Sequence, residues 1–263
     1  MTNPLITLMT DFGLSDHFVA ALKGVIVTLC PTARLIDVTH QIPAHDIRAA
    51  AFVLDQTIRW FPPDTVHLAI VDPGVGSNRR ILAGRWNRQM IVAPDNGLVS
   101  LVHIRSQHHE VYEVTNRELF LPEVSATFHG RDILAPVAAH LANGRPLSSV
   151  GPVLNQPLVM HLNQPILENR RLIGEVIYVD SFGNLITNIS IAQVRKFKTP
   201  AIQIGKHAIH GLAVNYTGQI TGQPLALIGS TGLLEIAVNQ GSARDELKIN
   251  LGEPVIVTDT DSC

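Results

Sequence analysis

Two short segments of the chain carry side chains that could activate a water molecule. Residues 71–80 read Val-Asp-Pro-Gly-Val-Gly-Ser-Asn-Arg-Arg and include Asp72 and Arg79. Residues 128–132 read Phe-His-Gly-Arg-Asp and include His129. A carboxylate, a guanidinium and an imidazole can bind water and move its proton without a metal ion. These residue types therefore indicate a polar catalytic centre.

Both segments also have an ordinary structural explanation. The Pro and Gly residues after Asp72 are typical of a tight turn, and Arg79 could pair with Asp72 in a purely structural ion pair. His129 is one of 12 histidines, and most histidines lie on the surface or in satisfied core positions. Spacing alone leaves a structural and a catalytic role equally open.

The sequence shows no signature of a metal or nucleotide cofactor. There is no His-x-x-x-His pair and no Cys/His cluster, so we expect no metal site. Residues 10–13 contain the letters Asp-Phe-Gly of protein kinases, but the other kinase motifs are missing. No Walker A sequence or dinucleotide-binding glycine pattern occurs. The expected chemistry therefore needs no cofactor.

Alternating strand and helix patterns predict how these residues are positioned. We expect strands at residues 5–9, 35–38, 66–71 and 89–93 and helices at 18–29, 44–61 and 132–141. Such alternation predicts an α/β sheet with parallel segments. Ligands gather beyond the carboxyl ends of such strands, where Asp11, Asp72 and Asp95 fall. We therefore expect these three acids to converge on one crevice.

The second part of the chain has a different pattern. Residues 151–171 are punctuated by Gly-Pro and Gln-Pro pairs, as in a linker. Short β-rich runs follow at 174–178, 185–189, 201–204, 225–228, 233–238 and 254–258. We predict an N-terminal α/β sheet domain at residues 1–165 and a smaller C-terminal all-β, barrel-like domain at 166–263.

Polar residues in this second part have weaker individual signals. Residues 180–188 and 229–232 read as turns beside strands. Glu235 lies inside an apolar run, where an unpaired buried acid is costly. We expect Glu235 either to be buried opposite a cation or to face water.

Bulk composition limits the classes of partner. With 46% hydrophobic and 16% charged residues and a net charge of -2, we expect a globular protein without a nucleic-acid or membrane partner. No apolar run reaches the roughly 18 residues of a membrane span. The start lacks a secretory pattern, so we expect a cytoplasmic protein. Cys30 and Cys263 are the only cysteines, which excludes a disulfide framework.

Taken together, these segments resemble the S-adenosyl-L-methionine hydroxide adenosyltransferase family, which is related to fluorinase and chlorinase. The resemblance runs nearly end to end, through residues 10–13, 37–40, 71–80, 93–97, 128–132 and 180–188. This collinear series is far more specific than any one motif. It implies an enzyme that hydrolyses S-adenosyl-L-methionine to adenosine and L-methionine, with water or hydroxide attacking the ribose C5'.

The resemblance also implies roles for individual residues. Arg79 and His129 would polarise the water, while Asp72 would fix the arrangement. Asp11 would bind the ribose. The remaining roles fall on the C-terminal part: Asp180 and Ser230 would hold the methionine amino and carboxylate groups, and Asn184 would contact adenine. With the residues at the strand ends and the acid in the apolar run, the predicted substrate-binding set is Asp11, Asp95, Asn96, Asp180, Asn184, Ser230 and Glu235.

Assembly and reaction class follow from the same resemblance. Members of the family are trimers or pairs of trimers, with sites between the larger domain of one subunit and the smaller domain of its neighbour. Halogenating relatives have an aromatic residue at the position of Asp72, so the acid favours water over halide. The alternatives are a halide-dependent adenosyl transferase, a non-catalytic sensor of S-adenosylmethionine or adenosine, and a metallohydrolase.

Overall fold

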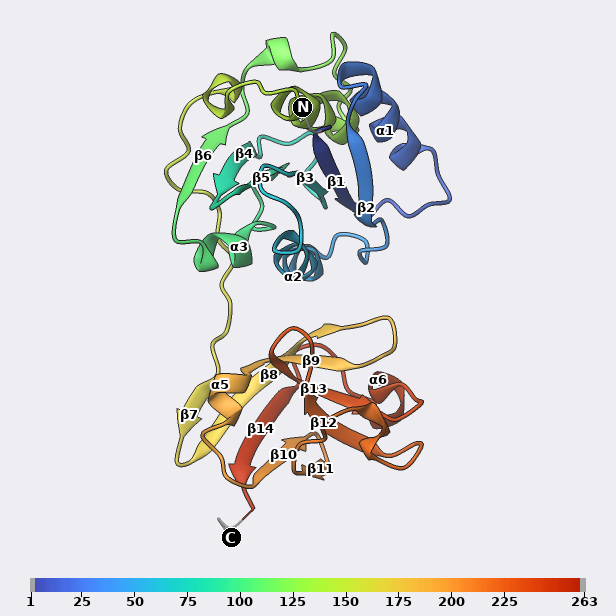
Figure 1. Cartoon of the computed structure of the whole chain (residues 1–263), viewed down its shortest axis with the longest axis vertical. Coiled ribbons are helices and arrows are strands. Elements are labelled where there is room, and N and C mark those ends of the chain that lie inside the picture. The colour runs from blue at the N-terminus through green and yellow to red at the C-terminus, as the bar shows by residue number, and fades with distance from the viewer. Residues whose placement is uncertain (1–2, 261–263) are drawn as a thin grey trace. The chain divides into compact units, whose positions relative to one another are not determined.

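The computed structural model describes residues 3–260, which form two compact units that divide between Met160 and His161 (Figure 1). The domain boundary at residues 165/166 that the sequence suggests lies a few residues further along and stays a prediction. Cys263 lies outside the described residues, and Cys30 is a buried free cysteine.

The first unit is built on a six-stranded sheet of order β2-β1-β3-β5-β4-β6. Its strands are β1 (Leu5–Thr10), β2 (Arg34–Thr39), β3 (Val66–Ile70), β4 (Ile81–Trp86), β5 (Gln89–Pro94) and β6 (His109–Glu113). Strands β2, β1, β3 and β5 pair in parallel, while β4 is antiparallel to both β5 and β6. The predicted α/β sheet with parallel segments is therefore confirmed.

Helices cover both faces of this sheet. They are α1 (Phe18–Leu29), α2 (Ile47–Ile58), α3 (Ser100–Arg105) and α4 (Ala135–Ala142), with short segments η1 (Arg117–Leu119), η2 (Gly130–Leu134) and η3 (Leu147–Val150). Helices α1 and α4 pack together on one face, and α2 and α3 on the other (Figure 1). This layering leaves the carboxyl ends of the parallel strands at one edge, where their loops carry the candidate site.

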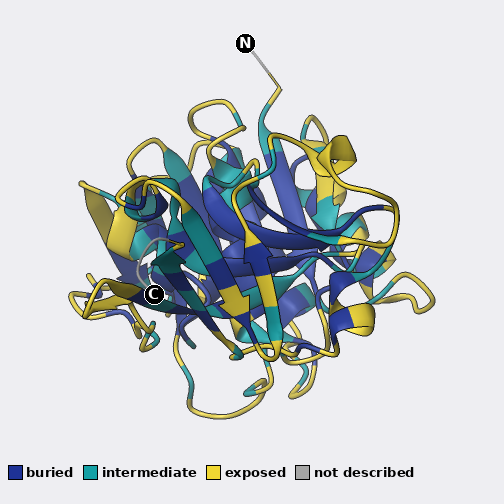
Figure 2. Ribbon diagram, turned by 90° about the horizontal axis from the view of Figure 1, so that it is seen from below, coloured by how far each residue is buried: buried dark blue, intermediate teal, exposed yellow. Residues whose placement is uncertain are grey.

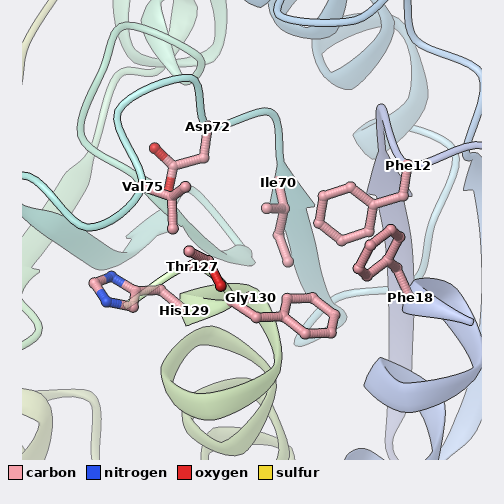
Figure 3. A pocket seen from close by; sticks show the side chains of 9 residues that line it. Phe12, Phe18, Ile70, Asp72, Val75, Thr127, His129 and Gly130 are labelled. Atoms are coloured by element: carbon pink, nitrogen blue, oxygen red, sulfur yellow. The ribbon is translucent and has the colours of Figure 1, made fainter. Parts of the chain in front are cut away.

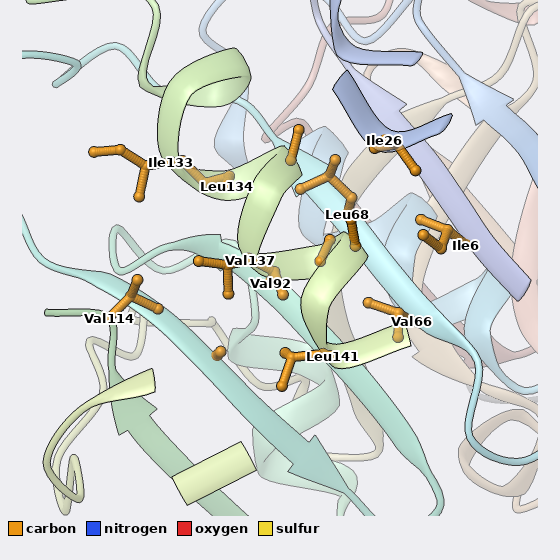
Figure 4. Close-up of a cluster of buried hydrophobic side chains, with 14 of the residues drawn as sticks. Ile6, Ile26, Val66, Leu68, Val92, Val114, Ile133, Leu134, Val137 and Leu141 are labelled. Atoms are coloured by element: carbon orange, nitrogen blue, oxygen red, sulfur yellow. The ribbon is translucent and has the colours of Figure 1, made fainter. Parts of the chain in front are cut away.

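The largest hydrophobic core lies between the sheet and the α1/α4 layer. Ile6 and Leu68 from the sheet meet Ile26 from α1 and Val137 and Leu141 from α4, all nearly inaccessible to solvent (Figure 4). Each fully buried side chain of this size contributes roughly 1.5–3 kcal/mol. The apolar period of α1 and α4 therefore fixes the helices against β1 and β3, and with them the loops at the strand ends.

Several elements differ from the sequence prediction. The helix expected at 44–61 begins only at Ile47, because the Asp46 side chain accepts a hydrogen bond from the Ala49 N–H and caps the helix there. The helix expected from Asp132 begins earlier, with a π-helical segment at Gly130. Strands β4 and β6 and helix α3 were not expected, since they are short and interrupted by charged residues or glycine.

The second unit is an antiparallel sheet of order β11-β10-β14-β8-β9-β13-β12, with β7 on the side of β8. Its strands are β7 (Ile166–Glu168), β8 (Arg171–Val179), β9 (Leu185–Ser190), β10 (Pro200–Ile204), β11 (His207–His210), β12 (Pro224–Ile228), β13 (Leu233–Val238) and β14 (Pro254–Asp259). The short helical segments are α5 (Ile191–Val194), η4 (Tyr216–Gly218) and α6 (Ala243–Leu247). The sheet is nearly closed on itself, so the predicted barrel-like domain is confirmed.

Burial differs from strand to strand in the second unit. Strand β13 is buried along its whole length, β8 alternates over its first residues, and β7 is exposed throughout. Figure 2 shows this contrast between buried strands and exposed loops across the chain. The segment predicted as a linker, residues 151–171, is partly structured: Val153 bridges to Tyr112, and β7 lies inside the segment. The proline-rich sequence of this segment indicated neither the bridge nor the strand.

Candidate active site

The loop after β3 places Asp72 at the carboxyl end of a central strand. In this loop Gly76 has a φ of 80°, and a Cβ there would lie 2.5 Å from the carbonyl oxygen of Ala126. Glycine is therefore required both for the left-handed backbone and for the close approach. The approach brings the Asp72 loop against the segment that leads to His129.

Asp72, Arg79 and His129 meet in one hydrogen-bonded group. The Arg79 Nε donates to both Asp72 carboxylate oxygens at 2.7 Å, and a terminal guanidinium nitrogen also bonds Oδ2. The same terminal nitrogen lies 3.2 Å from Nδ1 of His129. Side-chain exposure is 10% for Arg79 and 6% for Asp72. The structure thus assembles the three residues expected to be catalytic, with the guanidinium as the bridge.

The contact with Arg79 fixes the tautomer of His129. A guanidinium has only donors, so the Nδ1 facing it must offer a lone pair, and the proton of a neutral ring then sits on Nε2. Burial lowers the pKa of His129, the charge of Arg79 lowers it further, and the charges of Asp72 and Asp132 act against both. The ring is therefore neutral at pH 7, with an N–H donor at Nε2.

The segment around His129 is held by its own hydrogen bonds. The fully buried Asp132 accepts from the N–H of Ser125 at 2.9 Å and from Arg131 Nε at 2.6 Å. The Ser125 hydroxyl in turn accepts from the N–H of Phe128 at 3.0 Å. His129 itself directly precedes the π-helical segment that leads into α4. Such wide turns are frequent at functional sites, because they reorient one side chain.

Asp72 and His129 line a cavity of about 210 Å³. Its wall consists of Phe12, Phe18, Ile70, Asp72, Val75, Thr127, Phe128, His129 and Gly130. Figure 3 shows Asp72 and His129 on one side and the rings of Phe12 and Phe18 on the other. Phe128 packs its ring 5.9 Å from that of Phe12 and 5.3 Å from that of Phe18. The cavity therefore joins two polar groups to an aromatic, apolar wall.

Sequence reasoning missed this aromatic wall. The sequence pattern places Phe12 in a loop and Phe18 in a helix, and it gives no signal at Thr127. The signal lies in the motif at 128–132, whose aromatic residue precedes His129 directly. Contacts between segments so distant in sequence do not show in local periodicity.

Asp11 stands at the end of β1, with a side chain that is 9% exposed. Its Oδ2 accepts a hydrogen bond of 2.9 Å from the N–H of His45. The carboxylate is thus held at the strand end, as expected. Asp11 is not part of the cavity wall just described, and its ribose-binding role stays a prediction.

Asp95 and Asn96 have partners that explain them structurally. Asp95 pairs with Arg80 at 2.6 Å and accepts from the N–H of Leu158 at 2.7 Å. Asn96 donates to the carbonyl of Val71 at 2.8 Å. These contacts tie the end of β5 to its surroundings. The expected meeting of Asp95 with Asp72 in one crevice is not seen in the cavity, and substrate binding by Asp95 and Asn96 stays a prediction.

Asp180 and Asn184 bind one another at a turn of the second unit. One Asp180 oxygen accepts from the Asn184 N–H and the other from the Asn184 side-chain amide, each at 2.9 Å. Ser230 is exposed in the turn between β12 and β13. The structure keeps these groups close to a turn, while their substrate contacts stay predictions.

Glu235 has a partner that the sequence did not suggest. It is buried on β13, and the Tyr216 hydroxyl donates to it at 2.6 Å. Burial raises the pKa of Glu235 against the effect of this hydrogen bond, and the negative charge of Asp180 adds to the rise. Of the two expectations, a facing cation or water, neither describes the contact: the partner is a phenol. Substrate binding by Glu235 stays a prediction.

Between residues 3 and 260, no three His, Cys, Asp or Glu side chains are grouped so that they could hold a metal ion. None of the helices in that range is long and apolar enough to cross a membrane.

Comparison with known proteins gives matches along nearly the whole chain. The family models for the SAM hydroxide adenosyltransferase N-terminal and C-terminal domains match residues 6–151 and 174–256. A protein of Salinispora tropica named (R)-S-adenosyl-L-methionine hydrolase is 40% identical, covering 97% of this chain and 98% of its own. One of Thermus thermophilus with the same name is 38% identical, covering 94% and 96%.

More distant and structural relatives agree. A fluorinase of an Actinoplanes species is 28% identical, covering 97% of this chain and 98% of its own. The crystal structure of an uncharacterised conserved protein from Thermotoga maritima superposes with a TM-score of 0.91 at 39% identity, covering 96% of this chain and 99% of that one. The chain belongs to the SAM hydroxide adenosyltransferase family.

Proposed function

We propose that this protein hydrolyses S-adenosyl-L-methionine to adenosine and L-methionine, with the oxygen of water attacking the ribose C5'. Relatives named (R)-S-adenosyl-L-methionine hydrolase, at 38% and 40% identity over nearly their full length, support the proposal. The observation that carries it is the bridge by which Arg79 joins Asp72 to His129 on the wall of a largely apolar cavity.

The reaction balances without a cofactor. The bond between C5' and the sulfonium sulfur breaks, and its electrons convert the cation into the neutral thioether of methionine. The water oxygen forms the new bond to C5' and loses one proton to solvent. Charge on the substrate disappears along the way, so an apolar wall such as that of Phe12, Phe18 and Phe128 favours the reaction over the bound ground state.

The hydrogen bonds define what each group can do. Arg79 and the Nε2–H of His129 are donors and orient the lone pairs of the attacking oxygen, while Asp72 holds the guanidinium in place. In this tautomer His129 donates at Nε2, and its Nδ1 is occupied by Arg79. The ring can accept a proton at Nδ1 only by releasing Arg79.

Charge also favours water over halide as the nucleophile. The carboxylate of Asp72 neutralises Arg79, and His129 is neutral at pH 7. The group therefore carries no net charge that would draw a halide ion out of water. The fluorinase relatives make halide transfer the alternative to be tested.

The experiment is turnover of S-adenosyl-L-methionine by purified, metal-free protein in halide-free oxygen-18 water. We expect labelled adenosine plus methionine, one proton released per turnover, and loss of both in His129→Ala. Halide transfer releases no proton and yields 5'-halo-adenosine only when halide is added. Tight binding of intact substrate without products would replace the proposal with the non-catalytic sensor.

Cofactor, assembly and location extend the same proposal. We infer that no metal or redox cofactor takes part, because displacement by water at C5' needs neither; full activity in chelator tests this.

We also propose a homotrimer or a dimer of trimers with sites between subunits. Exposed apolar residues of the second unit, Phe182, Val214 and Ile220, support such contacts, and light scattering measures the mass. A cytoplasmic location follows from an intracellular substrate, and cell fractionation tests it.

A further inference from the structure

The turn that carries Asp11 is held by a buried histidine, His40. The parallel register pairs Met9 of β1 with Thr39 of β2, so the next residues, Thr10 and His40, lie side by side. The His40 Nδ1 is 2.9 Å from the Thr10 hydroxyl oxygen. That oxygen also accepts from the N–H of Phe12 at 3.2 Å. The His40 side chain, just beyond β2, thus contacts the Thr10 hydroxyl, which in turn binds the N–H of Phe12, so the two neighbours of Asp11 are joined through one hydroxyl.

The backbone of His40 also binds the turn that carries Asp11. Its carbonyl oxygen accepts from the N–H of Gly13 at 2.7 Å, where Gly13 has a φ of 68°. Further along the connection that follows β2, the His45 N–H donates to Asp11. The whole turn of residues 10–13 is therefore fixed from the β2 side, including the carboxylate itself.

His40 is in turn oriented by a charged pair. Its Nε2 lies 3.1 Å from Oδ1 of Asp37, and Lys23 bonds the other Asp37 oxygen at 2.6 Å. Burial raises the pKa of Asp37, but the hydrogen bonds from Lys23 and His40 outweigh it and hold that pKa below its ordinary value. The ring thus has the Thr10 hydroxyl at Nδ1 and the Asp37 carboxylate at ion-pair distance from Nε2, which makes no aligned hydrogen bond. Neighbours on both sides limit the orientation of the ring.

His40 does not touch the reacting groups. Its side chain is 2% exposed, Thr10 is fully buried, and neither residue belongs to the cavity wall. Any influence on the reaction must pass through the turn. Within that turn, Phe12 faces the cavity and Asp11 is the residue predicted to bind ribose.

We propose that His40 is a positioning residue which, through Thr10, holds the Asp11 carboxylate in place for the two hydroxyls of the substrate ribose. A carboxylate at a strand end binds vicinal hydroxyls only when both its oxygens are correctly placed. The inference rests on the proposed function, since an adenosyl substrate supplies the ribose. Its consequence is that His40 governs ribose discrimination without contacting the ligand.

The test measures binding of adenosine and 2'-deoxyadenosine to the full-length protein by calorimetry. We expect the wild type to prefer adenosine and Asp11→Asn to lose that preference. His40→Ala should reduce the preference about tenfold, as for loss of a hydrogen bond to a charged group. In the Asp11→Asn background, His40→Ala should have no further effect, because both changes remove the same interaction.

Conservative variants separate the two ends of the ring. Asn places an amide near the position of Nδ1, so His40→Asn should restore much of the preference. Gln reaches only toward the position of Nε2, so His40→Gln should restore little. Thr10→Val, which keeps the side-chain volume, should behave like His40→Ala. These variants decide the question even where His40→Ala does not fold.

A matched control is a second buried histidine, on β3, that binds a threonine of the same strand β1. His67 is also buried, with its Nδ1 2.7 Å from the hydroxyl oxygen of Thr7 on β1. His67→Ala should lower stability but leave the preference for adenosine unchanged. The inference is overturned if His67→Ala has the same effect on preference, if the His40 and Asp11 effects add, or if Asp11→Asn keeps the preference. Wild-type turnover in oxygen-18 water separately decides the proposed function.

Discussion

Arg79 and His129 lie 50 positions apart in sequence, yet the guanidinium donates to Nδ1 of the imidazole across 3.2 Å. The contact makes the state of the histidine depend on the arginine. It also requires the planar, forked guanidinium, which bonds Asp72 and His129 at the same time.

Arg79→Lys should lower kcat about 100-fold, in the range found when an oriented donor is lost. A lysine keeps the charge but cannot bond Asp72 through two nitrogens and still reach His129. Steady-state kinetics with S-adenosyl-L-methionine measure the effect. The neighbouring Arg80, which pairs with Asp95 and the carbonyl of Gln156, offers the control. Arg80→Lys should change kcat little; equal losses would contradict the special role of Arg79.

Activity should fall at acidic pH, at a value below the ordinary pKa of 6.5 for histidine. Burial and Arg79 lower the pKa of His129, so the neutral and active ring persists until the pH falls through that lowered pKa. Since Asp72 opposes the shift, Asp72→Asn should lower the pKa further. Titration of the His129 ring signals by NMR checks both statements. A pKa above 6.5 would contradict the arrangement.

His67 should make the fold sensitive to acid. Burial lowers its pKa to about 4, against the hydrogen bond to Gln89, while the unfolded chain has the ordinary value of 6.5. The folded state binds the proton on His67 less readily than the unfolded chain does. The free energy of unfolding is therefore fully present above pH 6.5 and falls as the pH drops toward 4. The loss is on the order of 3 kcal/mol, at about 1.4 kcal/mol per pKa unit. Urea unfolding between pH 7 and pH 4 measures it, and His67→Asn should flatten the dependence.

Gly76→Ala should lower kcat by about 10- to 100-fold, the effect of misplacing catalytic groups by a fraction of a bond length or more. The new Cβ would lie 2.5 Å from the Ala126 carbonyl, at a φ of 80°. The two loops must then separate, which weakens the contact between Arg79 and His129. Gly74→Ala is the control, because its Cβ would meet no atom closer than 3.5 Å. Kinetics and thermal melting of both variants separate a local shift from unfolding.

Sites shared between subunits predict complementation. Asp180→Asn and His129→Ala proteins, each inactive alone, should recover part of the activity after they are mixed, dissociated and reassembled. Each mixed oligomer then contains sites in which both residues are intact. Mixing without dissociation is the control, and should give no recovery. Persistent inactivity after reassembly would count against shared sites.

The sequence predicted the polar residues of the site better than the aromatic residues that line its cavity. Asp72 follows a strand that reads clearly as buried, and Arg79 and His129 belong to distinctive motifs, so their meeting could be anticipated. The rings of Phe12 and Phe18 gave no such signal. Their common cavity depends on how α1 packs on the sheet, and local patterns do not contain that information.

The sequence predicted the central strands of the fold but not strand β4, because only the former are long apolar runs. Long apolar runs identified the central strands, whereas β4 contains Gly84 and Arg85 and turns sharply at Asn87, which has a φ of 52°. The link between Thr10 and His40 was also invisible, since it depends on the register between β1 and β2. Residue types indicate which reactions are possible, but the pairing of strands determines which side chains lie in contact.

The π-helical segment at Gly130–Leu134 lies between His129 and helix α4, so it sets the direction in which the His129 side chain points relative to that helix. A π-turn holds one residue more than an α-turn, and each residue in a helix turns the direction of its side chain by about 100°. Removing one residue here would swing His129 away from Arg79 while Val137 and Leu141 kept their places in the core. A single insertion or deletion at this point would therefore change which groups His129 faces, and it would also disturb the buried Ile133 and Leu134 of the same segment.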